Sequence, residues 1–299
     1  MCSACLKSPS AVIGRLLLVC TILLGGTSSM AAESTSLRYF PAGDIYEYRW
    51  KLLELALEHT QDNQSLPKLQ AVAEGATQNR GMEMLLAGDL DVMALGANEE
   101  RESKLLPVKI DMLRGIVGFR LLIIRSADQP RMARMSAEDL RKQLTFGLNS
   151  QWADVPVMQK NGFTVVTSTS YENLFDMLKA GRFDAFPRGL NEAQRELDER
   201  QARYPELAVE RTKAIYFPFP IYFWVNKNNP ALAARIERGL KLALQDGSFR
   251  KLFESYHARE IAALQHAKRQ VIRLDNPILP PNNALPDTSW WWPDGPAPR

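Results

Sequence analysis

The chain has 299 residues, of which 45% are hydrophobic and 24% charged, so it can bury the core of one large domain or two smaller ones. These values exclude a small disulfide scaffold, a collagen-like chain and a chain disordered throughout. The formal charge is +3, and it falls to +1 without the first 30 residues, which hold Lys7 and Arg15 but no acid. Because nucleic-acid-binding proteins carry a strong basic excess, we expect no nucleic-acid partner.

The N-terminus has the pattern of an export signal. Lys7 and Arg15 precede the apolar run at residues 16–24, and small residues at 25–29 are followed by Met30 and Ala31. A basic region, a short apolar core and a small-x-Ala site predict a signal peptide at residues 1–31 that is cleaved after Ala31. The apolar run is roughly half the length needed to span a bilayer. We therefore expect export to the periplasm without a membrane anchor.

The cysteines all lie in this N-terminal segment, at Cys2, Cys5 and Cys20. The mature chain therefore forms no disulfide, no thiolate metal site and no cysteine nucleophile. Lipidation of Cys20 is an alternative, but Val19 stands where a lipoprotein signal normally has a small residue.

After the signal, short apolar strands alternate with amphipathic helices. The first block contains predicted strands at 37–40, 68–72 and 92–95 and predicted helices at 45–60 and 79–87. The second block contains a helix that begins at Ser136, strands at 145–148, 164–167 and 184–186, and helices at 152–160, 171–180 and 190–203. Long apolar segments occupy 115–124 and 214–225, and the last two helices begin at Asn229 and after Gly247.

This alternation predicts an α/β fold with mostly parallel sheets flanked by helices. Two blocks joined by two long segments predict two lobes between which the chain crosses twice. We expect lobe 1 at residues 32–115 and 216–270, and lobe 2 at 116–215. The Pro- and Trp-rich tail at 271–299 is either a strap packed over the body or a docking segment, since exposed tryptophans would promote aggregation.

Four motifs resemble those of one family. They are GDLDV at 88–92, EERESK at 99–104, SYENLFDMLKAGRFDAF at 170–186 and NPALAARIERGLKLALQDGSFRKLFESY at 229–256. Their order and sequence resemble the family 3 periplasmic solute-binding proteins, best known as polar amino-acid receptors of ABC importers. GRFDAFPRG and RLDNPILPP resemble a less characterised subgroup. The first 50 mature residues match only loosely, and the tail after residue 265 lies outside the pattern.

The resemblance implies a two-lobed type II periplasmic-binding-protein fold with two crossover hinge strands and a ligand cleft between the lobes. A general rule for α/β sheets agrees with it, because such sheets bind ligands beyond the carboxyl ends of their strands. We therefore expect the ligand-binding residues just after predicted strands.

Arg101 and Asn98 follow the strand at 92–96 and are predicted to bind the ligand. The resemblance places Arg101 where amino-acid receptors have an arginine that grips the ligand carboxylate through a two-pronged contact. The alternative is a surface arginine that pairs with Glu99 or Glu102.

Arg188, Trp152 and Tyr46 complete the predicted ligand site. Arg188 follows the strand at 184–186 and faces a helix start, a combination that favours an anion, although a salt bridge with Glu192 is the alternative. Trp152 could stack on the ligand or pack the lobe, and both interpretations remain open. Tyr46 follows the first strand, where one of several aromatic residues is expected to line the cleft.

The sequence departs from the amino-acid receptors at three positions of the expected cleft. The acid that holds the ligand amine falls at Gly189, the Gly-Thr carboxylate loop falls at residues 151–152, and a usual hydroxyl residue falls at Gly96. These departures weigh against a free α-amino acid. The expected ligand is small and anionic or amino-acid-like.

Catalytic signatures are missing from the sequence. It has no G-x-S-x-G, phosphate-loop or H-E-x-x-H motif, and His59, His257 and His266 lack metal-like spacing. We expect neither an enzyme nor a cofactor or metal site. The expected protein is a monomer that delivers a small-molecule ligand to an ABC permease. The alternatives are a sensor or adaptor for a membrane signalling protein and, third, a small-molecule lyase, because some relatives of this fold are dehydratases.

Overall fold

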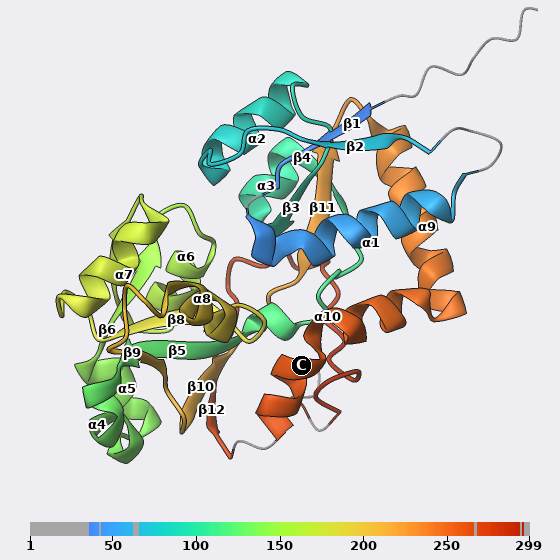
Figure 1. Cartoon of the computed structure of the whole chain (residues 1–299). Helices are drawn as coiled ribbons and strands as arrows, with labels where there is room; N and C mark the ends of the chain where they lie inside the picture. The colour runs from blue at the N-terminus through green and yellow to red at the C-terminus, as the bar shows by residue number, and fades with distance from the viewer. Residues whose placement is uncertain (1–35, 42, 62–65, 266–267, 294, 296–299) are drawn as a thin grey trace, which may run out of the picture. The chain divides into compact units, whose positions relative to one another are not determined.

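The computed structural model describes residues 36–41, 43–61, 66–265, 268–293 and 295 (Figure 1). The predicted signal peptide, its cleavage site and the three cysteines lie outside these residues.

Lobe 1 is the part built around β1–β4 and β11. β1 (Ser36–Tyr39) pairs in parallel with β2 (Lys68–Ala71). A parallel bridge from Tyr39 to Val92 also links β1 to the residue just before the third strand. β3 (Met93–Gly96), β11 (Ile221–Asn226) and β4 (Leu105–Val108) form an antiparallel sheet with β11 in the middle.

The helical elements next to these strands are η1 (Asp44–Tyr46), α1 (Glu47–Glu58), α2 (Gln78–Ala87), α3 (Glu99–Lys104), α9 (Pro230–Asp246) and α10 (Ser248–Gln265). α1 and α9 pack against each other (Figure 1). A Cβ atom at Gly239 of α9 would lie 1.9 Å from the carbonyl oxygen of Ala56 in α1. Only glycine therefore permits this close approach of the two helices.

Lobe 2 is the part built around one seven-stranded sheet. Its strands are β5 (Phe119–Arg125), β6 (Thr145–Asn149), β7 (Thr164–Ser168), β8 (Ala185–Gly189), β9 (Leu207–Val209), β10 (Lys213–Tyr216) and β12 (Gln270–Arg273). The order is β12-β10-β5-β8-β6-β7, and β9 also pairs with β5. β6 runs parallel to β7 and β8, β10 runs parallel to β12, and β5 runs antiparallel to β8, β9 and β10.

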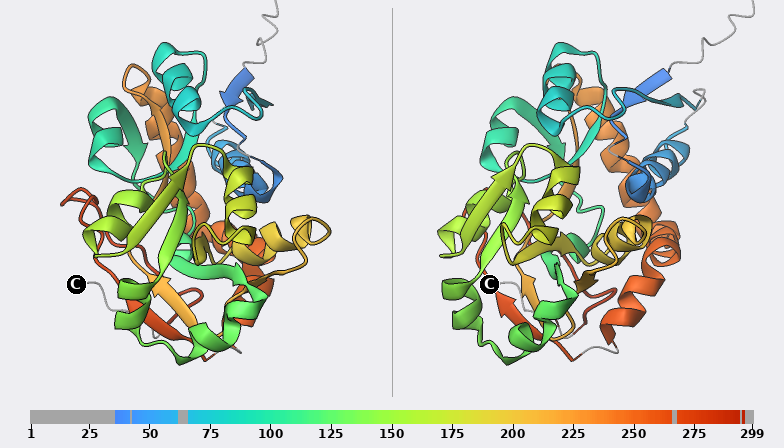
Figure 2. Two further views of the ribbon diagram at one scale, coloured as in Figure 1. Left: turned by 90° about the vertical axis from the view of Figure 1, so that its left-hand side faces the viewer. Right: turned by 60° about the vertical axis from the view of Figure 1, so that its left-hand side comes forward.

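The helical elements of lobe 2 lie around this sheet (Figure 2). They are η2 (Ile116–Gly118), η3 (Ser126–Asp128), α4 (Gln129–Arg134), α5 (Ala137–Gln143), α6 (Asp154–Lys160), α7 (Tyr171–Lys179) and α8 (Ala193–Arg200). The predicted helix start at Ser136 is confirmed, because its hydroxyl and the Asp139 carboxylate form a complete capping box. Asn229 likewise caps α9.

The region around Arg188 differs from the prediction. The strand predicted at 184–186 extends to Gly189 as β8, and the helix predicted at 190–203 is the shorter α8. The amide of Glu192 donates to the carbonyl of Gly189 at 2.8 Å, so a turn separates strand from helix. Arg188 therefore lies within a strand and not after one.

The two long apolar segments carry the chain between the lobes. The first comprises η2 and β5, whereas the second divides into β10 of lobe 2 and β11 of lobe 1, with Pro218 and Pro220 between them. The Phe217 amide donates to the Gly118 carbonyl at 3.2 Å, so the two crossings are joined by a hydrogen bond. Asp111 strengthens this junction, because its carboxylate accepts from the amides of Ile221 and Gly115.

The tail packs on the body in the way that a strap would. Trp291 is 2% exposed, its indole N–H donates to the carbonyl of Arg114 at 2.7 Å, and its ring meets that of Phe119 edge-on. Trp290 packs against Phe249 of α10, with ring centroids 5.4 Å apart. The tail thus covers the first crossing segment with apolar contacts of the kind that stabilise a core.

Candidate functional site

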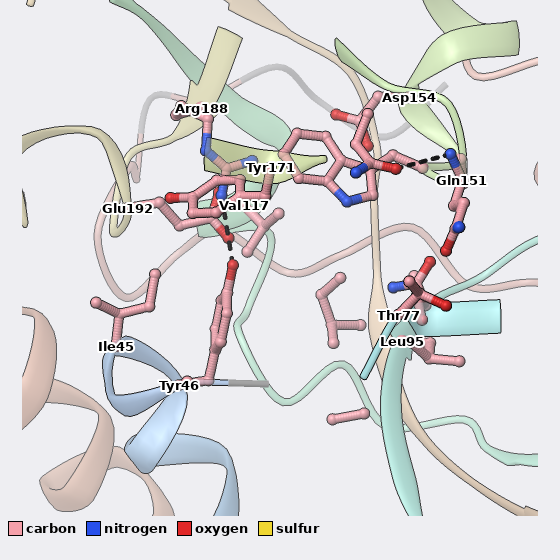
Figure 3. A pocket seen from close by; sticks show the side chains of 18 of the residues that line it. Ile45, Tyr46, Thr77, Leu95, Val117, Gln151, Asp154, Tyr171, Arg188 and Glu192 are labelled. Carbon is pink, nitrogen blue, oxygen red and sulfur yellow. Dashed lines mark hydrogen bonds and ion pairs between the residues drawn. The ribbon is translucent and has the colours of Figure 1, made fainter. Parts of the chain in front are cut away.

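A cavity of about 780 Å³ lies between the two lobes (Figure 3). Lobe 1 contributes η1, the carboxyl end of β3 and the segment before α2, and lobe 2 contributes the β6–α6 and β7–α7 loops and the β8–α8 turn. Val117 and Phe219 of the two crossing segments also line it. The lining therefore follows the carboxyl ends of strands, as expected, and the volume suits a small organic molecule.

Two hydrogen bonds link the lobes across this cavity. The Arg188 guanidinium donates to the Tyr46 hydroxyl at 3.3 Å, and the Asn79 amide donates to the Gln151 side chain at 3.2 Å. Figure 3 shows Tyr46 reaching towards Arg188 from the opposite lobe. The lobes are thus in polar contact on both sides of the cavity.

Arg101 lines the cavity and is 5% exposed. Its guanidinium donates to the carbonyl of Gly96 at 2.6 Å and to the side chain of Gln78 at 2.8 Å. No described carboxylate forms an ion pair with it, so the alternative of a surface pair with Glu99 or Glu102 does not apply. Burial lowers the pKa of Arg101 to about 10, which leaves it charged at neutral pH.

Arg188 also lines the cavity, but its charge is neutralised within the protein. The guanidinium binds both carboxylate oxygens of Glu196 at 2.5–3.0 Å and lies 3.1 Å from the carboxylate of Glu192. Burial alone would lower the pKa of Arg188, but these two carboxylates raise it well above its ordinary value. The salt bridge with Glu192, which the sequence left open as the alternative, is therefore present.

Arg120 and Asp154 form a second buried pair at the cavity wall. Arg120 projects from β5, and its guanidinium lies 2.6 Å from the carboxylate of Asp154, the first residue of α6. Glu192 lies 3.8 Å from the same guanidinium. Burial alone would raise the pKa of Glu192, but Arg188 and Arg120 hold it below its usual range. One carboxylate thus connects two arginines.

Trp152 lines the cavity and also packs the lobe. The Arg188 guanidinium lies 4.4 Å from the centre of its ring, and the ring of Phe186 is nearly parallel to it at 6.1 Å. The ring therefore packs within the lobe, and its stacking on a ligand stays a prediction.

Tyr46 and Asn98 take different positions relative to the cavity. Tyr46 lines it from η1, and the Arg49 guanidinium lies 4.1 Å from its ring centre. Asn98 is not among the described lining residues. Its side-chain oxygen caps α3 by accepting from the Arg101 amide at 2.8 Å, so it orients the helix that carries Arg101.

Gly189 leaves space that Glu192 fills. A Cβ atom at Gly189 would lie 3.0 Å from a carboxylate oxygen of Glu192, which accepts from the Gly189 amide at 2.9 Å. The carboxylate next to Gly189 is therefore that of Glu192, three residues further along the chain, and it lies close to the guanidinium groups of Arg188 and Arg120.

Arg49 and Arg120 also line the cavity and were not predicted from the sequence. Arg120 is the charged residue in the run 119–124, and a lone charge in a buried strand is a signal that could have been used. Arg49 resembles any polar residue of an amphipathic helix, so no sequence signal marks it.

The described residues contain no group of three or more His, Cys, Asp or Glu side chains that could hold a metal ion. Within the same residues, every helix is too short or too polar to cross a membrane.

Comparison with known proteins identifies the fold. No family model and no curated protein matches the chain. A Salmonella typhimurium periplasmic binding protein with high arginine specificity matches at 14% identity and a TM-score of 0.53, over 74% of this chain and 98% of that one. An ancestral amino acid-binding protein, a precursor of cyclohexadienyl dehydratase, matches at 17% and 0.55, over 74% and 94%. A histidine kinase sensor domain with similarity to periplasmic binding proteins matches at 14% and 0.54, over 75% and 96%.

These likenesses show that the chain has the two-lobed α/β fold of periplasmic binding proteins, which confirms the predicted fold class.

Proposed function

We propose that the chain is a periplasmic solute-binding protein that captures a small anionic or amino-acid-like ligand between its lobes. One observation carries this proposal: the cavity is lined from both lobes and contains the buried guanidinium groups of Arg49, Arg101, Arg120 and Arg188. Such a site holds a small ligand while the crossings let the lobes close on it.

The proposal includes processing and domain organisation. The signal peptide at 1–31 is removed, lobe 1 comprises residues 32–115 and 216–270, lobe 2 comprises 116–215, and residues 271–299 form the tail. At two of these boundaries the sheet of lobe 2 extends further, because it includes Tyr216 at the end of β10 and all of β12 (Gln270–Arg273). The mature protein is a periplasmic monomer. Arg101, Arg188, Trp152 and Tyr46 face the ligand, and Asn98 acts through the helix that carries Arg101.

The favoured partner is an ABC permease, to which the closed protein delivers its ligand. The alternative partner is a membrane signalling protein, and the likeness to a histidine kinase sensor domain supports this alternative. Uptake of the labelled ligand by cells with and without this chain separates the two. Lost uptake supports transport, whereas unchanged uptake with altered gene expression supports signalling.

The proposed protein binds its ligand without transforming it. One similar structure is a precursor of a dehydratase, so a lyase is the competing function. The buried carboxylates of the cavity are held by arginines, which leaves Glu192 and Asp154 unsuited to accept a proton. Mass spectrometry of the ligand after incubation with the protein is expected to show no conversion.

A thermal-shift screen of the mature protein against metabolites of every charge class tests the proposal. A ligand at 100 times its Kd stabilises by about 2.7 kcal/mol, which corresponds to roughly 5–10 °C for a chain of this size. Trp152→Leu in the cavity should reduce the shift, whereas Leu242→Ala on the exposed face of α9 should not. If no metabolite shifts the melting temperature, the solute-binding function is contradicted.

A further inference from the structure

The buried charged groups around the cavity do not balance. The buried cations are Arg49, Arg101, Arg120 and Arg188, and the buried carboxylates are Asp154, Glu192 and Glu196, all at most 9% exposed. Four guanidinium groups therefore face three carboxylates. A buried charge without a counterion is costly, so this excess of one positive charge requires compensation.

Two of the arginines use all three carboxylates. Glu196 binds Arg188 through both of its oxygens, Asp154 binds Arg120, and Glu192 lies between the two arginines. None of these carboxylates is left to receive a cationic group of a ligand. An incoming ammonium group would have to break a buried ion pair, which is unfavourable because the arginine would lose its counterion.

Arg49 and Arg101 are the other two arginines, and neither forms an ion pair within the described ranges. The charges of Glu192 and Asp154 act on them only from beyond ion-pair distance. Arg49 donates to the carbonyl of Ala94 at 3.3 Å, and Arg101 donates to the carbonyl of Gly96 and to Gln78. Both guanidinium groups therefore lie against β3 and line the cavity. A guanidinium has five N–H donors, so each retains donors for a ligand.

The carboxylates at the cavity rim do not change this arrangement. Glu172 and Glu199 both pair with Arg200, at 2.6 and 3.0 Å, and their side chains are about half exposed. Because they are half exposed and already paired with Arg200, water screens their charge.

We propose that the ligand is an organic monoanion whose carboxylate compensates Arg49 and Arg101 and which carries no ammonium group. This inference rests on the proposed solute-binding function and specifies its ligand class. The cavity volume exceeds what an inorganic oxyanion fills, and Phe40, Val117 and Phe219 offer apolar surface to the remainder of the molecule. The ligand therefore combines one carboxylate with an apolar or aromatic body.

Matched pairs of compounds test this specificity by isothermal titration calorimetry of the full mature chain. Each pair is an amino acid and its deaminated analogue: phenylalanine with 3-phenylpropanoate, tyrosine with 3-(4-hydroxyphenyl)propanoate, and leucine with 4-methylpentanoate. Arginine serves as the cationic probe. In at least one pair the deaminated member should bind, and it should do so at least about tenfold more tightly than the amino acid. Arginine should not bind.

Two variants test whether the unpaired arginines cause the preference. Arg101→Gln keeps donors for the Gly96 carbonyl but removes the charge, and Arg49→Gln does the same beside Ala94. In either variant, the deaminated compound should bind at most about threefold more tightly than its amino acid. Arg250→Gln, on the exposed face of α10, is the matched control and should leave the ratio of the two affinities unchanged.

The outcomes separate this inference from the function on which it rests. Tighter binding of an amino acid than of its deaminated analogue, or binding of arginine, would overturn the inference and leave the solute-binding function intact. The inference also fails, and the function survives, if no carboxylate binds at about 10 mM while the metabolite screen finds a neutral or cationic ligand. If the screen finds no ligand of any class, both fail.

Discussion

The tryptophan tail provides the sharpest prediction about stability, through the substitution Trp291→Ala. The side chain is 2% exposed, packs edge-on against Phe119 and donates its indole N–H to the carbonyl of Arg114. Truncation of a buried tryptophan costs about 3–5 kcal/mol, including the cavity that it leaves. Since roughly 2–4 °C is lost per kcal/mol in a chain of this size, Trp291→Ala should lower the melting temperature by about 6–20 °C.

A second substitution at the same site separates packing from hydrogen bonding. Trp291→Phe keeps an aromatic ring but leaves the Arg114 carbonyl without its donor, so it should cost about 1–3 kcal/mol. Leu242→Ala on α9, where the side chain is 37% exposed, is the control and should change stability by at most about 0.5 kcal/mol. Thermal and urea unfolding followed by circular dichroism measure all three variants. If Trp291→Ala unfolds like the control, the tail does not pack on the body, and the docking interpretation of the tail would replace the strap.

Four further predictions concern the ion-pair network, the pH dependence linked to two histidines, and lobe motion. Glu196→Ala leaves the Arg188 guanidinium without its two-pronged partner and should destabilise the fold by about 3–5 kcal/mol in urea unfolding; a loss below about 1 kcal/mol would contradict the buried pair. Burial lowers the pKa of His257 to about 3, whereas an unfolded imidazole takes up a proton near 6.5. The stability linked to His257 is therefore complete above about pH 6.5 and is lost as the pH falls towards 3, so His257→Phe should flatten the acid side of the stability profile. His59, whose pKa is raised by its hydrogen bond to Asp246, should act in the opposite sense: the stability removed by His59→Gln is complete below about pH 6.5 and is lost as the pH rises through the raised pKa. Saturating ligand should change the small-angle scattering curve as the lobes rotate about the crossings, and identical curves would argue against closure.

The fold was predictable because the pattern of apolar residues is local. Short apolar runs, helix caps such as Ser136 and Asn229, and two long apolar segments are each visible within a few residues. The ends of elements were less predictable. β8 continues to Gly189 because strand pairing with β5, which no local pattern records, extends that far.

The candidate site was predictable at single positions and not as a network. Arg101, Arg188, Trp152 and Tyr46 were found because each lies close to the end of a strand, and all four line the cavity. The partners of Arg188 were only partly visible. Glu192 lies four residues on, but the sequence does not show that Glu196 takes both prongs of the guanidinium.

Arg120 and the tail show where local sequence information ends. Arg120 pairs with Asp154 on an element that folds against it from a distant part of the chain. Trp291 and Arg114 are 177 residues apart, and only their contact decides between a strap and a docking segment. Charge balance inside a cavity depends on such distant pairs, so the excess of one buried positive charge emerges only from the structure.

The central claim, that the interlobe cavity holds the ligand, is tested most directly by calorimetric titration of the Arg101→Ala variant with the tightest ligand from the screen. Arg101 lines the cavity without a carboxylate partner, so its removal deletes a charge-assisted contact with the ligand and breaks no ion pair. Such a loss costs about 2–5 kcal/mol, which is a weakening of roughly 30-fold to several thousand-fold. Arg250→Ala on the exposed face of α10 should bind like the wild type. Wild-type affinity in Arg101→Ala would contradict the account, because the ligand would then bind somewhere other than this cavity.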